Sequence, residues 1–361
     1  MAEFISFQPS DFMSTLLYTG NGTAIGSGGN AVTGVGFAPD ATWIKQFSAT
    51  RIPAMWDTVR GVEQVVRPSS NAVDSTVGEG LTTFGADGFT LGDEESVNAD
   101  AGGFVAWNWK CGTTSGIATD GNTTITPGSY SFNTTSGVSV VKYTGNSSSG
   151  AKVAHGCGKI PFMIWIKNLE ATADWSVYHQ GMDPTDPGDY SLVLNNTSAR
   201  ADNVALFNDT ITDSVNFTLG DDAQVNSTGV DYIAYCFAQV PGFSKMGFYN
   251  GTGNADGHFQ FCGFRPAFIF IKDIDNSSTH FYLLDDKRGT ATVAAYNVSN
   301  NNYIQISDTA VQVVLDMIDV NSNGFKCRSN TSRINLNDTF IYSAFAQFPM
   351  VSSNDIPGVA R

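Results

Sequence analysis

One short segment occurs three times in this chain, as proline, three variable residues, an aromatic residue, isoleucine and lysine. The copies are Pro39–Lys45, Pro161–Lys167 and Pro266–Lys272. Apolar runs of this length, opened by proline and rich in Trp, Ile and Phe, are typical of β-strands. Proline at a strand's start removes no hydrogen bond from the sheet. A segment that recurs in this way indicates a repeated structural unit.

Four further landmarks accompany each copy in the same order. A tyrosine-led turn comes first, at Tyr18, Tyr143 and Tyr249. A second aromatic segment follows the strand, at Trp56–Gly61, Trp175–Gly181 and Phe281–Gly289. Next come Gly88–Gly92, Asn216–Gly220 and Gly324–Arg328, and last the closing strands Phe104–Trp109, Tyr232–Phe237 and Phe340–Phe345. Ordered recurrence of all these landmarks predicts three tandem units.

The landmarks divide the chain into an arm, three units, a linker and a tail. The predicted limits are 1–12 for the N-terminal arm, 13–112 for repeat 1, 113–137 for the linker, 138–241 for repeat 2, 247–350 for repeat 3 and 351–361 for the C-terminal tail. The first join is long and rich in Gly, Ser, Thr and Asn, whereas the second is short. We therefore expect repeats 2 and 3 to pack closely, and repeat 1 to stand apart.

The composition favours an all-β fold. Charged residues make up only 15% of the chain, and Gly, Ser, Thr and Asn replace them. These residues suit short strands with tight turns and weaken helices. Several short strands per unit predict an antiparallel β-sandwich of the jelly-roll kind. The expected repeat core is Trp43, Trp165, Phe270, Trp107 and Tyr235.

The lysine that ends each recurrent segment is either a working residue or a polar stop. Lys45, Lys167 and Lys272 occupy the same place in each unit. An active site rarely occurs three times at one strand end, so we expect lysines that extend toward water and limit strand pairing.

Charge and motifs exclude several classes of protein. The net charge of −15 disfavours nucleic acid, whose phosphates require a basic surface. The start shows no export signal, and no apolar run is long enough to cross a bilayer. Neither a Walker A motif nor a dinucleotide-binding glycine motif occurs. We expect no nucleic-acid partner and no membrane insertion.

No arrangement of residues predicts catalysis or a firm metal site. The five cysteines form no CxxC pair, and the four histidines are scattered. Asp57 with Arg60, and Asp285 with Arg288, are expected to cap turns as D-x-x-R-G segments. The acidic runs Asp93–Glu95, Asp221–Asp222 and Asp273–Asn276 are expected to be solvated turns, with Ca²⁺ as the alternative ligand. We expect no catalytic residues and no cofactor.

At the landmarks the chain resembles a repeat domain of virion proteins of marine bacteriophages, of the tail-fibre-like or structural kind. The matching segments are Phe37–Lys45, Trp56–Gly61, Asp87–Gly92, Val105–Lys110 and the opening Ile5–Phe12. The third unit departs most from the pattern, at Gly324–Arg328 and Phe340–Phe345. The resemblance implies a place on the virion and supplies no catalytic residues.

The expected function is a non-enzymatic structural protein on the exterior of a bacteriophage virion, as a tail fibre, a host-attachment protein or a capsid (head) decoration. A glycan-binding module is the alternative and can coexist with it, and an enzyme that degrades polysaccharide is a further one. The expected partners are other virion proteins, further copies of the chain in a homo-oligomer such as a trimer, and a host surface glycan.

The N-terminal arm is the candidate assembly segment. Its apolar residues are Phe4, Ile5, Phe7 and Phe12, and we expect the segment to have no counterpart in the other units. Eleven residues cannot form a core alone, so these side chains must be buried against the first unit or against a neighbour. Strand addition to an exposed sheet edge is the expected mode of contact. An extra strand within repeat 1 is the alternative.

Overall fold

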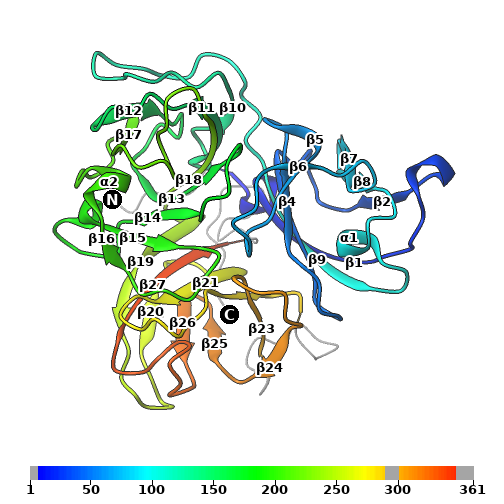
Figure 1. The fold of residues 1–361 in the computed structure, drawn as a ribbon. Helices are drawn as coiled ribbons and strands as arrows, with labels where there is room; N and C mark the ends of the chain where they lie inside the picture. The colour runs from blue at the N-terminus through cyan, green and yellow to red at the C-terminus, as the bar shows by residue number, and fades with distance from the viewer. Residues whose placement is uncertain (1–6, 289–300, 347–361) are drawn as a thin grey trace.

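The computed structural model describes residues 7–288 and 301–346, which form an all-β fold of antiparallel sheets. We call β1–β9 unit 1, β10–β18 unit 2 and β19–β27 unit 3. The three units are three lobes that meet at the centre of the molecule (Figure 1). This confirms the expected all-β sandwich class, while the residue limits drawn from the sequence stay predictions.

Unit 1 has a large sheet in the order β1-β9-β3-β4-β5-β6 and a small sheet β2-β8-β7. Its elements are η1 Pro9–Asp11, β1 Met13–Thr19, η2 Ile25–Ser27, β2 Asn30–Thr33, β3 Ala41–Gln46, β4 Ala54–Asp57, β5 Gly61–Val66, β6 Ser75–Thr76, β7 Leu81–Gly85, β8 Gly88–Leu91, α1 Glu95–Asn98 and β9 Gly103–Trp109.

Unit 2 repeats the order of the large sheet as β11-β18-β13-β14-β15-β16, with β10 added outside β11 and a small sheet β12-β17. Its elements are β10 Ser129–Asn133, β11 Val138–Thr144, β12 Ala151–Ala154, β13 Pro161–Asn168, β14 Ser176–His179, η3 Pro187–Asp189, β15 Tyr190–Val193, β16 Ala201–Asp202, α2 Val204–Phe207, β17 Asn216–Leu219 and β18 Asp231–Ala238.

Unit 3 has the same order once more, β19-β27-β21-β22-β23-β24, and a small sheet β20-β26-β25. Its strands are β19 Ser244–Asn250, β20 Phe259–Phe261, β21 Phe268–Asp273, β22 Tyr282–Asp285, β23 Asn301–Gln305, β24 Val313–Leu315, β25 Ile318–Asn321, β26 Gly324–Cys327 and β27 Thr339–Phe345. None of the helices in the described ranges is long and apolar enough to span a membrane.

The recurrent segment occupies the same register in every unit. Trp43 lies opposite Trp107, Trp165 opposite Tyr235, and Phe270 opposite Ser343. The recurrent strand pairs with the closing strand each time, and in unit 1 both strands are buried on their two faces. In unit 1, β9 turns Val105, Trp107 and Trp109 to one face and Phe104 and Ala106 to the other, as the alternation predicts.

The two faces of each large sheet are buried in different cores. One face packs against the small sheet of its own unit, and in unit 1 this core contains Ile44, Trp56 and Phe89. The opposite faces of all three large sheets meet in one shared core that includes Trp43, Trp165 and Phe270. The expectation that unit 1 stands apart is therefore wrong, because its Trp43 face has no small sheet to cover it and is buried against the other two units.

Candidate functional site

The boundary between units 1 and 3 contains a buried lysine. Lys45 is fully buried, and its ammonium donates hydrogen bonds to the carbonyls of Gln46 (2.9 Å) and Arg51 (2.8 Å) in its own unit. Its third bond reaches the Thr309 carbonyl of unit 3 at 3.1 Å. Lys45 follows Trp43 by two residues on a strand, so both side chains point to the shared face.

The other two lysines repeat this arrangement around the molecule. Lys167 of unit 2 donates to Asn168 and Ala173 of its own unit and to the Asn71 carbonyl of unit 1, at 3.2 Å. Lys272 of unit 3 donates to Asp273 and Asn276 of its own unit, to the Thr279 hydroxyl, and at 3.5 Å to the Thr197 carbonyl of unit 2. Unit 1 thus binds unit 3, unit 2 binds unit 1, and unit 3 binds unit 2.

These contacts overturn the expectation of water-facing lysines at strand ends. Lys45, Lys167 and Lys272 all have 0% exposure. A lysine ammonium has three N–H donors and no acceptor, and the three carbonyls around Lys45 match that number. Burial lowers the pKa of each of the three ammoniums to about 8. The sequence could not show that these lysines are buried, because the carbonyl that each binds across a boundary lies in another unit.

A second set of polar contacts joins the units at the strands that lie next to the recurrent strands, β4, β14 and β22. Asp57, at the end of β4, accepts the phenol hydrogen of Tyr235 in unit 2 at 2.6 Å. Asp57 also receives the Nε–H of Arg60 at 2.7 Å, so the predicted D-x-x-R-G turn forms with its ion pair. Burial holds the pKa of the Tyr235 phenol well above its usual range, and the hydroxyl stays protonated as a donor.

The equivalent positions of the other units make equivalent contacts. Asp285 of unit 3 accepts the indole N–H of Trp107 in unit 1 at 3.2 Å. His179 of unit 2 lies with Nε2 3.4 Å from the hydroxyl of Ser343 in unit 3. Burial lowers the pKa of His179 to about 4, so this imidazole is neutral near pH 7. Three rotationally equivalent contacts thus surround the shared core, and we call this arrangement the pseudo-threefold ring.

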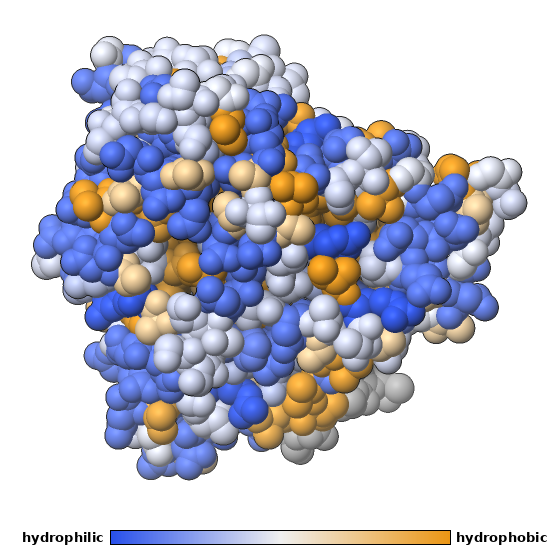
Figure 2. Space-filling model, viewed as in Figure 1, coloured by the Kyte–Doolittle hydropathy of each residue, from blue (hydrophilic) through white to orange (hydrophobic). Residues whose placement is uncertain are grey.

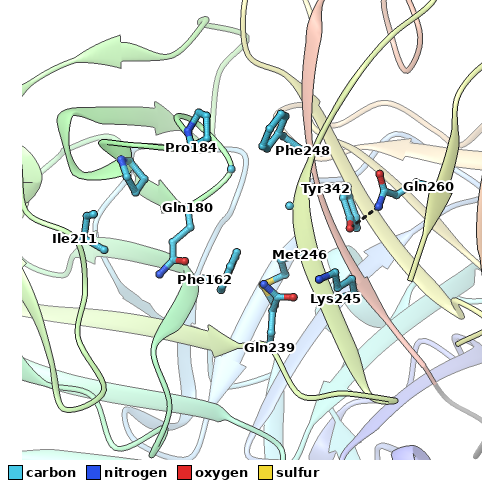
Figure 3. Close-up of a pocket in the computed structure, with 13 residues that line it drawn as sticks. Phe162, Gln180, Pro184, Ile211, Gln239, Lys245, Met246, Phe248, Gln260 and Tyr342 are labelled. Carbon is cyan, nitrogen blue, oxygen red and sulfur yellow. Dashed lines mark hydrogen bonds between the residues drawn. The ribbon is translucent and has the colours of Figure 1, made fainter. Parts of the chain in front are cut away.

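The candidate binding site is a groove between units 2 and 3, with a volume of about 470 Å³. Unit 2 supplies one wall and β19 of unit 3 the other (Figure 3). The groove-lining residues on the unit 2 side include Phe162, Gln180, Pro184 and Ile211. Those contributed by unit 3 include Lys245, Met246, Gly247, Phe248 and Tyr342. Pro184 and Phe248 face one another at the mouth (Figure 3).

The groove combines an apolar lining with fixed polar groups. Gln180 donates through Nε2 to the Pro161 carbonyl at 3.1 Å, and Gln260 donates to the Tyr342 hydroxyl at 2.9 Å. These bonds fix the amides against the walls. The viewed surface of the protein is otherwise largely hydrophilic, with separate hydrophobic spots (Figure 2). An apolar recess with a few oriented polar groups is typical of binding sites.

The residues singled out for chemistry do not assemble into one site. Within residues 7–288 and 301–346, no group of three or more His, Cys, Asp or Glu side chains has the arrangement of a metal site. Trp43, Trp165, Phe270, Trp107 and Tyr235 are buried in the shared core. The sequence did not predict the groove, because its walls come from segments far apart in the chain and no local pattern marks them.

The N-terminal arm is described only from Phe7 onward, and Phe4 and Ile5 lie outside the described residues. Phe7 and Phe12 contact the ring of Phe243, at 5.7 Å and 6.4 Å between ring centroids. These two side chains thus pack on the end of the shared core, at the turn between units 2 and 3. The use of the arm in assembly stays a prediction.

The geometry defines an all-β protein of antiparallel sandwiches in a pseudo-threefold ring, with an open groove between units 2 and 3. The family described as Domain of unknown function (DUF7483) matches residues 8–349, and the chain belongs to this family. No curated protein and no solved structure matches the chain.

Proposed function

We propose that the chain is a non-enzymatic structural protein on the exterior of a bacteriophage particle, as a tail-fibre, host-adsorption or head-decoration protein. The observation that carries the proposal is the pseudo-threefold ring, in which one chain closes three sandwiches around one aromatic core. The three buried lysines, each bonded across a boundary, fix the units relative to one another. A rigid body of this kind suits a protein that must display surfaces and hold its shape.

The resemblance of the landmark segments to virion repeat proteins supports the same proposal. The structure shows what several of these landmark residues contact. Trp43 and Lys45 face the shared core, and the Asp57–Arg60 turn reaches across to Tyr235. Several of the residues that carry the resemblance thus join units to one another, and a protein that shares them is expected to share the ring.

Electron cryo-microscopy of intact particles, compared with particles that lack the gene product, tests the proposal. We expect density of this three-lobed shape on the outside of the complete particles only. A purified particle that contains none of this chain by mass spectrometry, while the chain is abundant in the infected cell, would contradict it.

A second candidate function, glycan binding at the particle surface, is favoured by aromatic rings near the groove. Phe259 and Phe261 on β20 are 41% and 58% exposed, and Phe248 on β19 is 40% exposed. Exposed rings of this kind offer flat apolar faces on which sugar rings can stack. A glycan array with the purified protein tests this, and Phe261→Ala should weaken any signal that depends on the exposed rings.

A further inference from the structure

The first strands of units 2 and 3 differ in what covers their outer edges. In unit 2, β10 pairs along β11, with Ser131 opposite Val140 and Ser129 opposite Lys142. In unit 3, β19 pairs with β27 on one side, and no described strand pairs along its other side.

The uncovered edge of β19 presents main-chain groups for pairing. The amide of Ala346 donates to the Phe243 carbonyl at 2.8 Å, and that of Gly251 donates to the Asp338 carbonyl at 2.9 Å. Since pairing alternates along an antiparallel strand, residues 245, 247 and 249 face β27, and Met246 and Phe248 direct their N–H and C=O groups outward. These two positions match Val140 and Lys142 of β11, which β10 covers.

Met246 and Phe248 also line the groove between units 2 and 3. The register of β10 places Tyr130 opposite Val141, and the matching position in unit 3 is Gly247. Gly247 has no side chain, so an added strand could place an aromatic residue there, in the space that the Val141 side chain fills in unit 2. It would also meet the Tyr342 ring, which a Cβ at position 247 would approach to 3.3 Å.

We infer that the edge of β19 binds an extended peptide segment of another protein by β-strand addition. The segment carries an aromatic residue opposite Gly247 and no basic residue opposite Lys245. β10 shows the chemistry of the occupant, because the same chain fills the matching edge of unit 2 with Ser-Tyr-Ser-Phe-Asn. Main-chain bonds supply affinity in this mode, and side-chain pockets supply specificity. The inference goes beyond the proposed function and does not depend on where the protein resides.

Binding of a synthetic peptide with the sequence of residues 128–134, labelled with a fluorophore, tests the inference by fluorescence anisotropy. Phe248→Pro removes one outward N–H, and proline is tolerated on an edge where that group faces outward. We expect this variant to weaken binding by about tenfold, the effect of one lost hydrogen bond. Val73→Ala, an exposed change in unit 1, should leave the affinity unchanged.

Hydrogen exchange supplies a readout that does not rely on the folding of the proline variant. We expect the amides of Met246 and Phe248 to exchange quickly in the free protein and to be protected when the peptide is added. Val140 and Lys142 should be protected throughout. Peptide binding without new protection on β19, or equal affinity for wild type and Phe248→Pro, would overturn the inference.

Two further outcomes identify a different occupant and also overturn it. Full protection of Met246 and Phe248 in a monomeric free protein would mean that a segment of the same chain covers the edge. A dimer that Phe248→Pro converts to monomer would mean that a second copy covers it. Sedimentation of the free protein, with and without the peptide, distinguishes these cases.

Discussion

The indole of Trp43 in unit 1 packs edge to face on the indole of Trp165 in unit 2. The ring centroids are 5.6 Å apart, and the ring planes meet at 83°. The Trp165 ring lies a further 5.5 Å from the ring of Phe270 in unit 3. The aromatic residue of each recurrent segment thus meets its counterparts from the other units in the shared core. The stability of each unit therefore depends on the other two.

Trp165→Ala should destabilise the whole protein by about 3–5 kcal/mol, as other buried large-to-Ala changes do. Because the indole contacts unit 1 and unit 3, we expect one unfolding transition, shifted as a whole. Urea unfolding followed by fluorescence and by circular dichroism measures this. Two separated transitions in the variant would contradict a common core.

Lys167→Met should cost about 2–4 kcal/mol, because it leaves buried carbonyls on both sides of the boundary without donors. Methionine keeps the apolar stem, so the loss reports on the ammonium. Lys152→Met is the matched control, since Lys152 is partly exposed and makes a 3.5 Å ion pair with Asp213. That control should change stability by less than about 0.5 kcal/mol in thermal melts. Equal losses in the two variants would refute the role given to Lys167.

The buried lysines predict a pH dependence in the alkaline range. The folded pKa of Lys167 is about 8, below its ordinary value of 10.5, because burial disfavours the charged form. Between these values the unfolded chain binds more protons, so stability rises with pH. The stability gained from deprotonation of Lys167 is complete above the pKa of the unfolded chain. It is lost as the pH falls through the pKa of the folded protein.

Denaturant midpoints of wild type and Lys167→Met at about pH 7.5 and about pH 9.5 measure this term. The stability of wild type relative to the variant should increase at the higher pH. A difference that stays constant, or that shrinks, would show that the lysine does not titrate in this window.

Tyr235→Phe should cost about 1–3 kcal/mol, because the buried Asp57 carboxylate loses a donor from unit 2. Asp57→Asn and the double variant complete a thermodynamic cycle. We expect a coupling energy of about 1 kcal/mol or more, since the two groups are in direct contact. Tyr249→Phe, whose hydroxyl donates to Ile334 within unit 3, is the control and should not couple to Asp57. Additive losses for Asp57 and Tyr235 would disprove the contact.

The N-terminal arm shares a short sequence pattern with the opening of unit 2. Ile5–Gln8 stands as far before Met13 as Tyr130–Asn133 stands before Val138, and both segments read apolar, Ser, Phe, amide. Part of the arm thus resembles β10 in sequence, and its role in assembly stays a prediction. Deletion of residues 2–12, followed by measurement of the mass in solution and of binding to particles that lack the protein, tests the role of the arm in assembly.

The sequence by itself determined the strands and their order. Periodicity, prolines at strand starts and glycine turns are local signals, so Trp43, Trp165 and Phe270 could be assigned to equivalent buried strands, and Arg60 to a turn with Asp57. The tertiary structure alone decided what these residues meet. A lysine at a strand end reads as exposed until the Thr309, Asn71 and Thr197 carbonyls come from another unit to bind it. The groove has the same origin, because its walls join only when three sheets close around one core, and no local pattern encodes that closure.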